Sequence, residues 1–346
     1  METKELSNLQ KQEIMNILNE KEWDIKEWAR AIQIAPKYLQ WILDGYSPLN
    51  QQEYDELLRA TKDSKTKNMM RFSHPVVIVS WARKGGNGKT TVASNLSYNL
   101  SKLGYQTLAI DGDSQCDMTS TLFPEYMDHS DHNFYESMVR RKDIRKYIVD
   151  TDYPNLSIVP GSSFTEELER MLTTIRPEIA MDTFKDCIDE LLEENYYDFI
   201  IVDMDKSMGL LNKTILNAAD YVLVLAECSF YSVKALLPVT ERIEQVKQFN
   251  PKLDCLGMVF NKVNKRKNEV QRAIDDTDRI FPWDVMVNFI SNDGNVEKSQ
   301  RECLPLDEYA KNSKANKQLI ALTNEILSKI ETNIKEGRLD GEVKDI

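Results

Sequence analysis

The stretch that decides the fold is VVIVSWARKGGNGKTT, residues 76–91. Its first part is an apolar run, which is typical of a strand buried on both faces of a parallel sheet. Its second part is rich in glycine, and glycine accepts a positive φ and lets the backbone approach a phosphate. A helix that starts directly after such a loop directs free amides and a positive dipole toward an anion. The stretch therefore predicts a strand, a phosphate-binding loop and a helix, in that order.

The side chains of this loop are those that a nucleoside triphosphate needs. Lys89 can reach the β- and γ-phosphates, and the hydroxyl of Thr90 can ligate Mg²⁺. We expect the nucleotide to contact Gly85, Gly86, Asn87, Gly88, Lys89, Thr90 and Thr91.

The loop departs from the general phosphate-loop pattern, because Arg83 stands at its first glycine position and Lys84 precedes two glycines. Residues 84–90, KGGNGKT, resemble the deviant Walker A box of the ParA/MinD superfamily residue for residue. The resemblance implies ATP and Mg²⁺ as cofactors and a nucleotide-sandwich dimer. In such a dimer Lys84 would be a catalytic residue beside Lys89, because it would cross to the partner's phosphates and act like an arginine finger.

Two aspartates follow a later apolar run, in LAIDGDSQ at residues 108–115. The segment is similar to the I-D-x-D-P-Q box of the same family, with Ser114 in place of the proline. The resemblance makes Asp113 the catalytic residue that orients the attacking water. It leaves Asp111 to support the magnesium shell.

A third aspartate, Asp203, closes the apolar run at residues 199–202 in the shape of a Walker B strand. Such a strand delivers its acid to a magnesium-bound water. The family usually has two prolines shortly after this acid, where this chain has Asp205 and Lys206. We therefore expect nucleotide-dependent switching to differ in detail from the family.

Asn261 ends another apolar run and resembles the adenine-reading asparagine of the family, since its amide can pair with both a donor and an acceptor of the base. A basic segment follows it and could neutralise DNA phosphates without reading bases. A solvated helix face explains that segment equally well, because acidic residues interrupt and follow it. The candidate DNA contacts of this segment are Lys262, Lys265, Arg266, Lys267 and Arg272.

Apolar runs alternate with amphipathic segments through residues 76–334. This alternation predicts an α/β domain with a mostly parallel sheet flanked by helices, as in a P-loop NTPase of the ParA/MinD type. The expected strands are 76–82, 107–111, 156–159, 198–203, 221–227, 256–260 and 285–290. Residues 1–63 predict a small all-α domain, 64–75 a polar linker and 335–346 a flexible tail.

The pattern of residues 24–45 within this all-α domain is that of a helix-turn-helix, with Trp28 on the apolar side of a first helix and Pro36 at the start of a second. It resembles the phage-repressor class, and large plasmid ParA proteins carry such an extension to repress their own operon. Lys37 and Gln40 would then face the major groove. A three- or four-helix dimerisation cap remains open, because Gln33 replaces the usual turn glycine and the module is mildly acidic.

Charge and composition limit the functional classes. The chain has 44 Lys plus Arg against 56 Asp plus Glu, a net charge of −12, so any DNA contact must come from a local basic patch. The five cysteines are dispersed, and no run is apolar enough to span a membrane, which together favour a cytoplasmic protein without membrane attachment. Residues 337–346 also lack the continuous apolar face that a membrane-cycling MinD-type protein needs.

The resemblance implies an ATP-dependent DNA-segregation ATPase for a plasmid or a chromosome. Its ATP-bound homodimer would bind DNA regardless of sequence and associate with the nucleoid. A ParB-like centromere-binding protein would stimulate hydrolysis and so release the DNA. Two alternatives remain: a transcriptional repressor regulated by nucleotide, and an ATPase that positions a cargo other than DNA.

Overall fold

The computed structural model describes residues 7–21, 25, 28, 32, 36–46, 49–63, 70–126, 131–141, 143–264 and 267–343. The strands in these ranges are β1 (Met70–Phe72), β2 (Val76–Trp81), β3 (Thr107–Gly112), β4 (Val149–Asp150), β5 (Leu156–Val159), β6 (Phe199–Met204), β7 (Tyr221–Glu227), β8 (Asp254–Asn261) and β9 (Gly341–Val343). The helices are α1 (Asn8–Glu20), α3 (Pro36–Asp44), α4 (Gln51–Asp63), α5 (Lys89–Lys102), α6 (Asp117–Leu122), α7 (Phe134–Arg140), η1 (Ile144–Tyr147, a 3₁₀ helix), α8 (Thr165–Thr174), α9 (Pro177–Glu194), α10 (Leu210–Asn217), α11 (Phe230–Lys234), α12 (Leu236–Lys247), α13 (Lys267–Asp278), α14 (Gly294–Arg301), α15 (Leu306–Ala310) and α16 (Lys314–Lys335).

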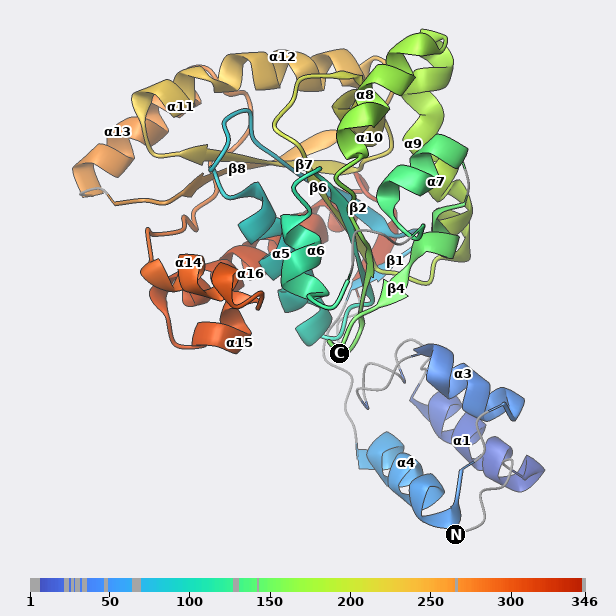
Figure 1. The fold of residues 1–346 in the computed structure, drawn as a ribbon. Helices are drawn as coiled ribbons and strands as arrows, with labels where there is room; N and C mark the ends of the chain where they lie inside the picture. The colour runs from blue at the N-terminus through green and yellow to red at the C-terminus, as the bar shows by residue number, and fades with distance from the viewer. Residues whose placement is uncertain are drawn as a thin grey trace.

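The centre of the molecule is a seven-stranded sheet in the order β4-β5-β3-β6-β2-β7-β8, in which all neighbours are parallel except β4 and β5. Successive residues of β2 face opposite sides: Val77 and Val79 pack with helices α7 to α13, whereas Val76 and Ile78 pack with α5, α6, α15 and α16. Figure 1 shows α11 and α12 along one side of the strands and α5 and α16 along the other. The predicted α/β class, a mostly parallel sheet flanked by helices, is confirmed.

One expected strand is wrong. Residues 285–290 do not form a strand of the sheet but run beside β8. Val285 forms a single bridge with Met258 of β8, and Ser291 forms one with Val263, just after β8 ends. The carboxylate of Glu325 on α16 accepts the backbone N–H groups of Val287 and Asn288, at 2.7 and 2.9 Å. A side chain from α16 thus accepts the backbone N–H groups that a further β-strand would otherwise bind.

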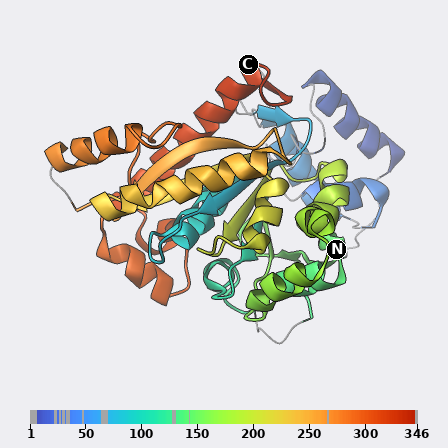
Figure 2. The ribbon, with the colours of Figure 1, turned by 90° about the horizontal axis from the view of Figure 1, so that it is seen from above.

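The expected linker and tail are also revised. Residues 70–72 and 341–343 pair as the antiparallel strands β1 and β9, with Phe72 opposite Gly341. Figure 2 shows the end of the chain beside β1. Phe72 is buried and packs edge-on against Phe199, with ring centroids 5.0 Å apart. Both segments therefore belong to the α/β domain, while 64–69 and 344–346 lie outside the described residues.

The N-terminal helices α1, α3 and α4 have a core of their own. Ile14, Leu39, Ile42 and Leu57 are among its buried residues, and Trp28 at its centre donates a hydrogen bond to Thr61 Oγ1 at 2.7 Å. Trp28 was expected on the apolar side of a first helix, and it is buried here. Most of the predicted helix at 24–32 lies outside the described residues, so the helix-turn-helix stays a prediction.

None of the described helices is both long and apolar enough to cross a membrane.

Candidate nucleotide-binding site

The glycine-rich loop connects β2 to α5 at the carboxyl edge of the sheet. Gly86 and Gly88 have φ values of 80° and 84°, which side chains rarely tolerate. A Cβ built on Gly88 would lie only 1.9 Å from Nδ2 of Asn261, so glycine is required there for space as well. The loop backbone is therefore accessible to an anion at the N-terminus of α5, where free N–H groups can bind it.

Hydrogen bonds from two asparagines attach this loop to the neighbouring strands β7 and β8. Asn87 is buried, and its Nδ2 donates to the carbonyl of Leu225 on β7 at 3.2 Å. Asn261 donates from Nδ2 to the carbonyl of Asn87 at 2.8 Å and accepts the N–H of Lys262 at 2.7 Å. Its amide therefore stabilises the loop, and the adenine-reading role of Asn261 stays a prediction.

Asp203 on β6 is fully buried beside the start of α5. Burial and the nearby Asp111 carboxyl raise the pKa of Asp203 well above its usual value. Lys89 and the Thr90 hydroxyl lie near enough to favour the charged form, but neither carboxylate oxygen has a hydrogen-bond partner of normal geometry. A buried carboxylate with both oxygens unpaired is costly unless a cation or its water completes it.

The residues at this point fit a magnesium ion. Mg²⁺ in phosphate sites commonly takes one or two protein oxygens and fills its other positions with water and phosphate. Thr90 and Asp203 can supply such oxygens. Among the described residues no group of three or more His, Cys, Asp or Glu side chains gathers to hold a metal by itself.

Asp111 differs from Asp203 in that both of its carboxylate oxygens accept hydrogen bonds. It pairs in register with Asp203 across β3 and β6, but its Oδ2 accepts both the N–H and the hydroxyl of Thr119, at 2.8 and 2.6 Å. Its Oδ1 accepts the N–H of Asp113 at 3.3 Å. Burial raises the pKa of Asp111 to about 6. These bonds make Asp111 a residue that shapes the loop after β3, and the geometry does not favour it as a metal ligand.

Asp113 faces the phosphate loop, as expected for a residue that orients water. Its Oδ2 lies 3.9 Å from Nζ of Lys89, and both side chains are about nine-tenths buried. Its Oδ1 accepts the N–H of Gln115 at 3.1 Å, which fixes the carboxylate. The structure thus brings Lys89, Thr90, Asp113 and Asp203 together at one end of the loop.

A cavity of about 510 Å³ opens beside these residues. Its wall includes the loop glycines, Asp113, Lys206 and Asn261, and also a segment that the sequence analysis missed. That segment supplies Ile290, Ser291, Asn292, Asp293, Val296 and Gln300. The one local signal was SNDG at residues 291–294, in which Asp293 caps α14. Gln300 donates to the hydroxyl of Thr91 at 3.0 Å and so joins this wall to α5.

Lys84 lies outside that cavity wall. Its ammonium pairs with Glu227 at the end of β7 at 2.9 Å, and the two side chains are 54% and 30% exposed. A lysine that serves a partner's phosphates has to point away from its own site. The orientation of Lys84 therefore agrees with the expected role without testing it.

The basic segment after β8 is only partly described. Lys262 lines the nucleotide cavity, and its Nζ would lie 4.0 Å from a Cβ built on Gly86. Lys262 therefore lies at the nucleotide site, and its predicted contact with DNA stays a prediction. Arg272 is exposed on α13, and Lys267 begins that helix. Lys265 and Arg266 lie outside the described residues, as does the side chain of Lys37.

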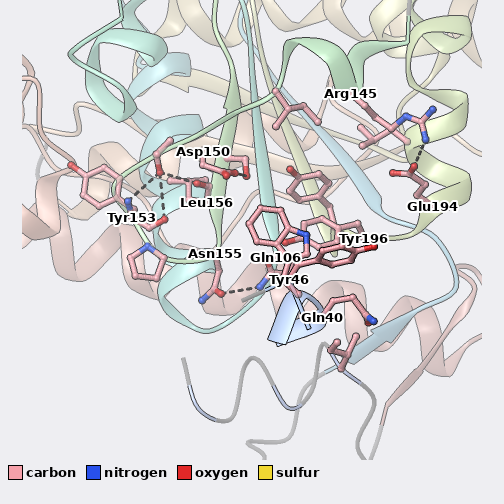
Figure 3. A pocket seen from close by; sticks show the side chains of 18 of the residues that line it. Gln40, Tyr46, Gln106, Arg145, Asp150, Tyr153, Asn155, Leu156, Glu194 and Tyr196 are labelled. Atoms are coloured by element: carbon pink, nitrogen blue, oxygen red, sulfur yellow. Dashed lines mark hydrogen bonds and ion pairs between the residues drawn. The ribbon is translucent and has the colours of Figure 1, made fainter. Parts of the chain in front are cut away.

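Gln40 on α3 lines a second cavity, of about 820 Å³, together with the start of β5 and the end of α9 (Figure 3). Its Nε2 donates to Asp44 at 2.9 Å. Trp41 and Tyr46 line the same cavity from the N-terminal side, and Gln106 and Tyr196 from the α/β domain. Gln40, which was expected to read DNA, thus lines a cavity shared with the α/β domain in this structure.

Comparisons with known proteins agree with this geometry. The sequence profile of a family described as AAA domain (AAA_31) matches residues 76–255. The chain is 31% identical over 249 residues to an uncharacterised protein of Methanocaldococcus jannaschii, which covers 70% of this chain and 94% of that protein. It is 28% identical over 248 residues to the chromosome partitioning protein ParA of Myxococcus xanthus, covering 71% and 86%.

The fold is similar to that of a plasmid partition protein of Borrelia burgdorferi B31 bound to AMPPNP. The two chains share 22% identity at a TM-score of 0.60. The similarity covers 75% of this chain and all of the other. At this identity the likeness concerns the fold alone.

Proposed function

Because the chain belongs to the ParA-type family of P-loop ATPases, we propose that it is a DNA-segregation ATPase that acts as an ATP-bound homodimer on a plasmid or a chromosome. The observation that carries the proposal is the position of Lys84. It belongs to the phosphate loop but lies outside the cavity wall and pairs with Glu227, whereas Lys89 and Asp113 line that cavity. In a dimer whose two phosphate loops face each other, that lysine would contact the phosphates bound by the second subunit.

The residues around the loop have separate tasks in the proposed reaction. The loop amides and Lys89 bind the β- and γ-phosphates, and Thr90 and Asp203 hold Mg²⁺. The ion, when bound, neutralises charge on the oxygens between these phosphates. Asp113 orients a water for attack on the γ-phosphorus, and the bond to the β-phosphate oxygen breaks. ADP and inorganic phosphate are the products.

The rest of the cycle follows from dimer formation. Two copies of α13 bring Arg272 and Lys267 of both subunits to one DNA duplex, and Lys265 and Arg266, which precede α13 in the sequence, are proposed as further contacts. Contacts to phosphates alone are independent of sequence and weaken steeply with salt. A ParB-like centromere-binding protein stimulates hydrolysis and so releases the DNA. The protein then works in the cytoplasm, in association with the nucleoid.

For residues 1–63 we propose operator binding through α3, with a dimerisation cap as the alternative. Gln40 lines the cavity toward the α/β domain, so α3 has to leave this position before it reads bases. A nucleotide-regulated repressor, or an ATPase that positions a cargo other than DNA, would use the same nucleotide site. These alternatives differ from partition in whether random DNA binding depends on ATP.

Dimer formation is the first test. With AMPPNP and Mg²⁺ we expect sedimentation velocity to show a dimer for the wild type and a monomer for Lys84→Ala that still binds nucleotide. Glu227→Gln frees Lys84 and should lower the dimer dissociation constant by no more than about fivefold, because partly exposed ion pairs contribute about 0–1 kcal/mol. Lys185→Ala, an exposed change on α9, serves as the control. A Lys84→Ala protein that dimerises like the wild type would contradict the proposal.

A further inference from the structure

Lys206 lies beside the phosphate loop at a position where the family usually has a proline. It follows the Walker B strand β6 three residues after Asp203 and lines the nucleotide cavity. A Cβ built on Gly85 would lie 3.7 Å from Cδ of Lys206. The stem of this lysine therefore runs along the first glycine of the loop.

The backbone that carries Lys206 is held in place without prolines. Asn212 is buried on α10, and its Nδ2 donates to the carbonyls of Asp205 and Ser207 at 2.8 and 2.7 Å. The N–H of Ser207 donates to Asp205 Oδ2 at 3.2 Å. The residues on both sides of Lys206 are thus fixed, and its side chain leaves from a defined point.

The four lysines near the phosphate loop differ in whether they form an ion pair. Lys84 pairs with Glu227, and Lys89 lies 3.9 Å from Asp113. Lys206 and Lys262, by contrast, form no ion pair within the part of the chain that the structure describes. Two unpaired ammonium groups thus reach one cavity from opposite sides, at Gly85 and Gly86.

The two lysines approach different parts of a bound nucleotide. Lys206 comes from the loop after Asp203, the acid that would hold Mg²⁺ beside the terminal phosphates of a bound nucleotide. Lys262 follows Asn261, which lies on the other side of the loop at Gly88. We propose that Lys206 binds the γ-phosphate of ATP within its own subunit and so distinguishes ATP from ADP, whereas Lys262 contacts phosphates that both nucleotides share. The inference deepens the proposed function and rests on it.

If Lys206 binds the γ-phosphate within its own subunit, ATP recognition precedes dimer formation. The monomer would recognise the γ-phosphate before any partner lysine arrives. Discrimination between ATP and ADP would then be a property of the single subunit, and Lys84 would act in the step that follows.

The test measures dissociation constants for AMPPNP and ADP, each with Mg²⁺, by isothermal titration calorimetry. All variants carry Lys84→Ala in the full chain, so that dimer formation does not add to the affinity. We expect Lys206→Met to weaken AMPPNP binding about tenfold, the low end for a hydrogen bond to a charged group, and to change ADP binding less than twofold. Lys206→Arg should restore discrimination, because a guanidinium also binds phosphate. Lys262→Met should weaken both nucleotides equally, and Lys185→Met neither.

Equal effects of Lys206→Met on both nucleotides, or none on either, would overturn the assignment of Lys206 to the γ-phosphate. Failure of the parent protein to bind either nucleotide would instead refute the proposed function. The two failures are therefore distinguishable in one set of titrations.

Discussion

Replacing Lys89 with alanine is expected to lower the rate of ATP hydrolysis by about a hundredfold to a thousandfold, the usual loss when one group that stabilises transition-state charge is removed. Lys89 opens α5 directly after the loop, and its ammonium is about nine-tenths buried beside Asp113. Because Lys89 is shielded from solvent, its charge interacts strongly with the phosphates, and a water molecule in its place would stabilise them less. The measurement is the release of inorganic phosphate at saturating ATP and Mg²⁺.

The matched control is Lys102→Ala, at the other end of the same helix. Lys102 also pairs with an aspartate, Asp307, but far from the cavity wall. We expect this change to affect thermal stability and to leave hydrolysis within about twofold of the wild type. Near-normal hydrolysis in Lys89→Ala would show that the phosphates bind elsewhere.

Replacing Asp203 with asparagine should have opposite effects on hydrolysis and on stability. Hydrolysis should fall by about a hundredfold or more, because the side chain proposed to hold Mg²⁺ loses its charge. The melting temperature of the protein without nucleotide and metal should rise. Burial raises the pKa of Asp203 well above its usual value, so folding at pH 7 costs free energy either to bury the charge or to protonate the carboxylate. Asparagine removes this charge at nearly the same volume.

The expected gain in stability is on the order of 1 kcal/mol or more, because an unsatisfied buried charge costs more than an unsatisfied buried amide. For a domain of this size that corresponds to several degrees. The measurement is differential scanning calorimetry at pH 7 in EDTA. Added Mg²⁺ and AMPPNP should stabilise the wild type more than the variant, since only the former holds the ion.

The control for Asp203 is Asp198→Asn, just before the same strand. Asp198 is buried but accepts the N–H of Gln106 at 2.8 Å. Its replacement should not raise the melting temperature and should leave hydrolysis intact. A lower melting temperature for Asp203→Asn in EDTA would mean that the carboxylate has a stabilising partner, and the magnesium assignment would lose its physical basis.

Local patterns predicted the centre of the site well. The apolar run of β2, the glycines and the start of α5 are contiguous, so their order and spacing determine the phosphate loop. Asp113 and Asp203 were predicted from their resemblance to family motifs, and the structure places both near the loop because parallel strands end at one edge of a sheet.

Features that depend on distant parts of the chain were not predicted. The pairing of Met70–Phe72 with Gly341–Val343 joins segments from opposite ends of the domain, and each segment alone is too short and polar to indicate a strand. Asp111 shapes the loop after β3 because Thr119 donates two hydrogen bonds to it, and the spacing of residues in the sequence does not predict these bonds. Lys262 belongs to the cavity because Asn261 holds its backbone beside the loop, whereas charge counting alone assigned it to a basic patch.

The most direct test of the account is binding to a random-sequence DNA duplex without nucleotide, with ADP and with ATP–Mg²⁺, across a salt series, for the wild type and Lys84→Ala. We predict that binding appears only with ATP–Mg²⁺, falls by decades between low and moderate salt and is lost in the variant. Binding that is indifferent to nucleotide, or absent throughout, would contradict the partition ATPase and direct attention to the N-terminal helices or to a cargo other than DNA.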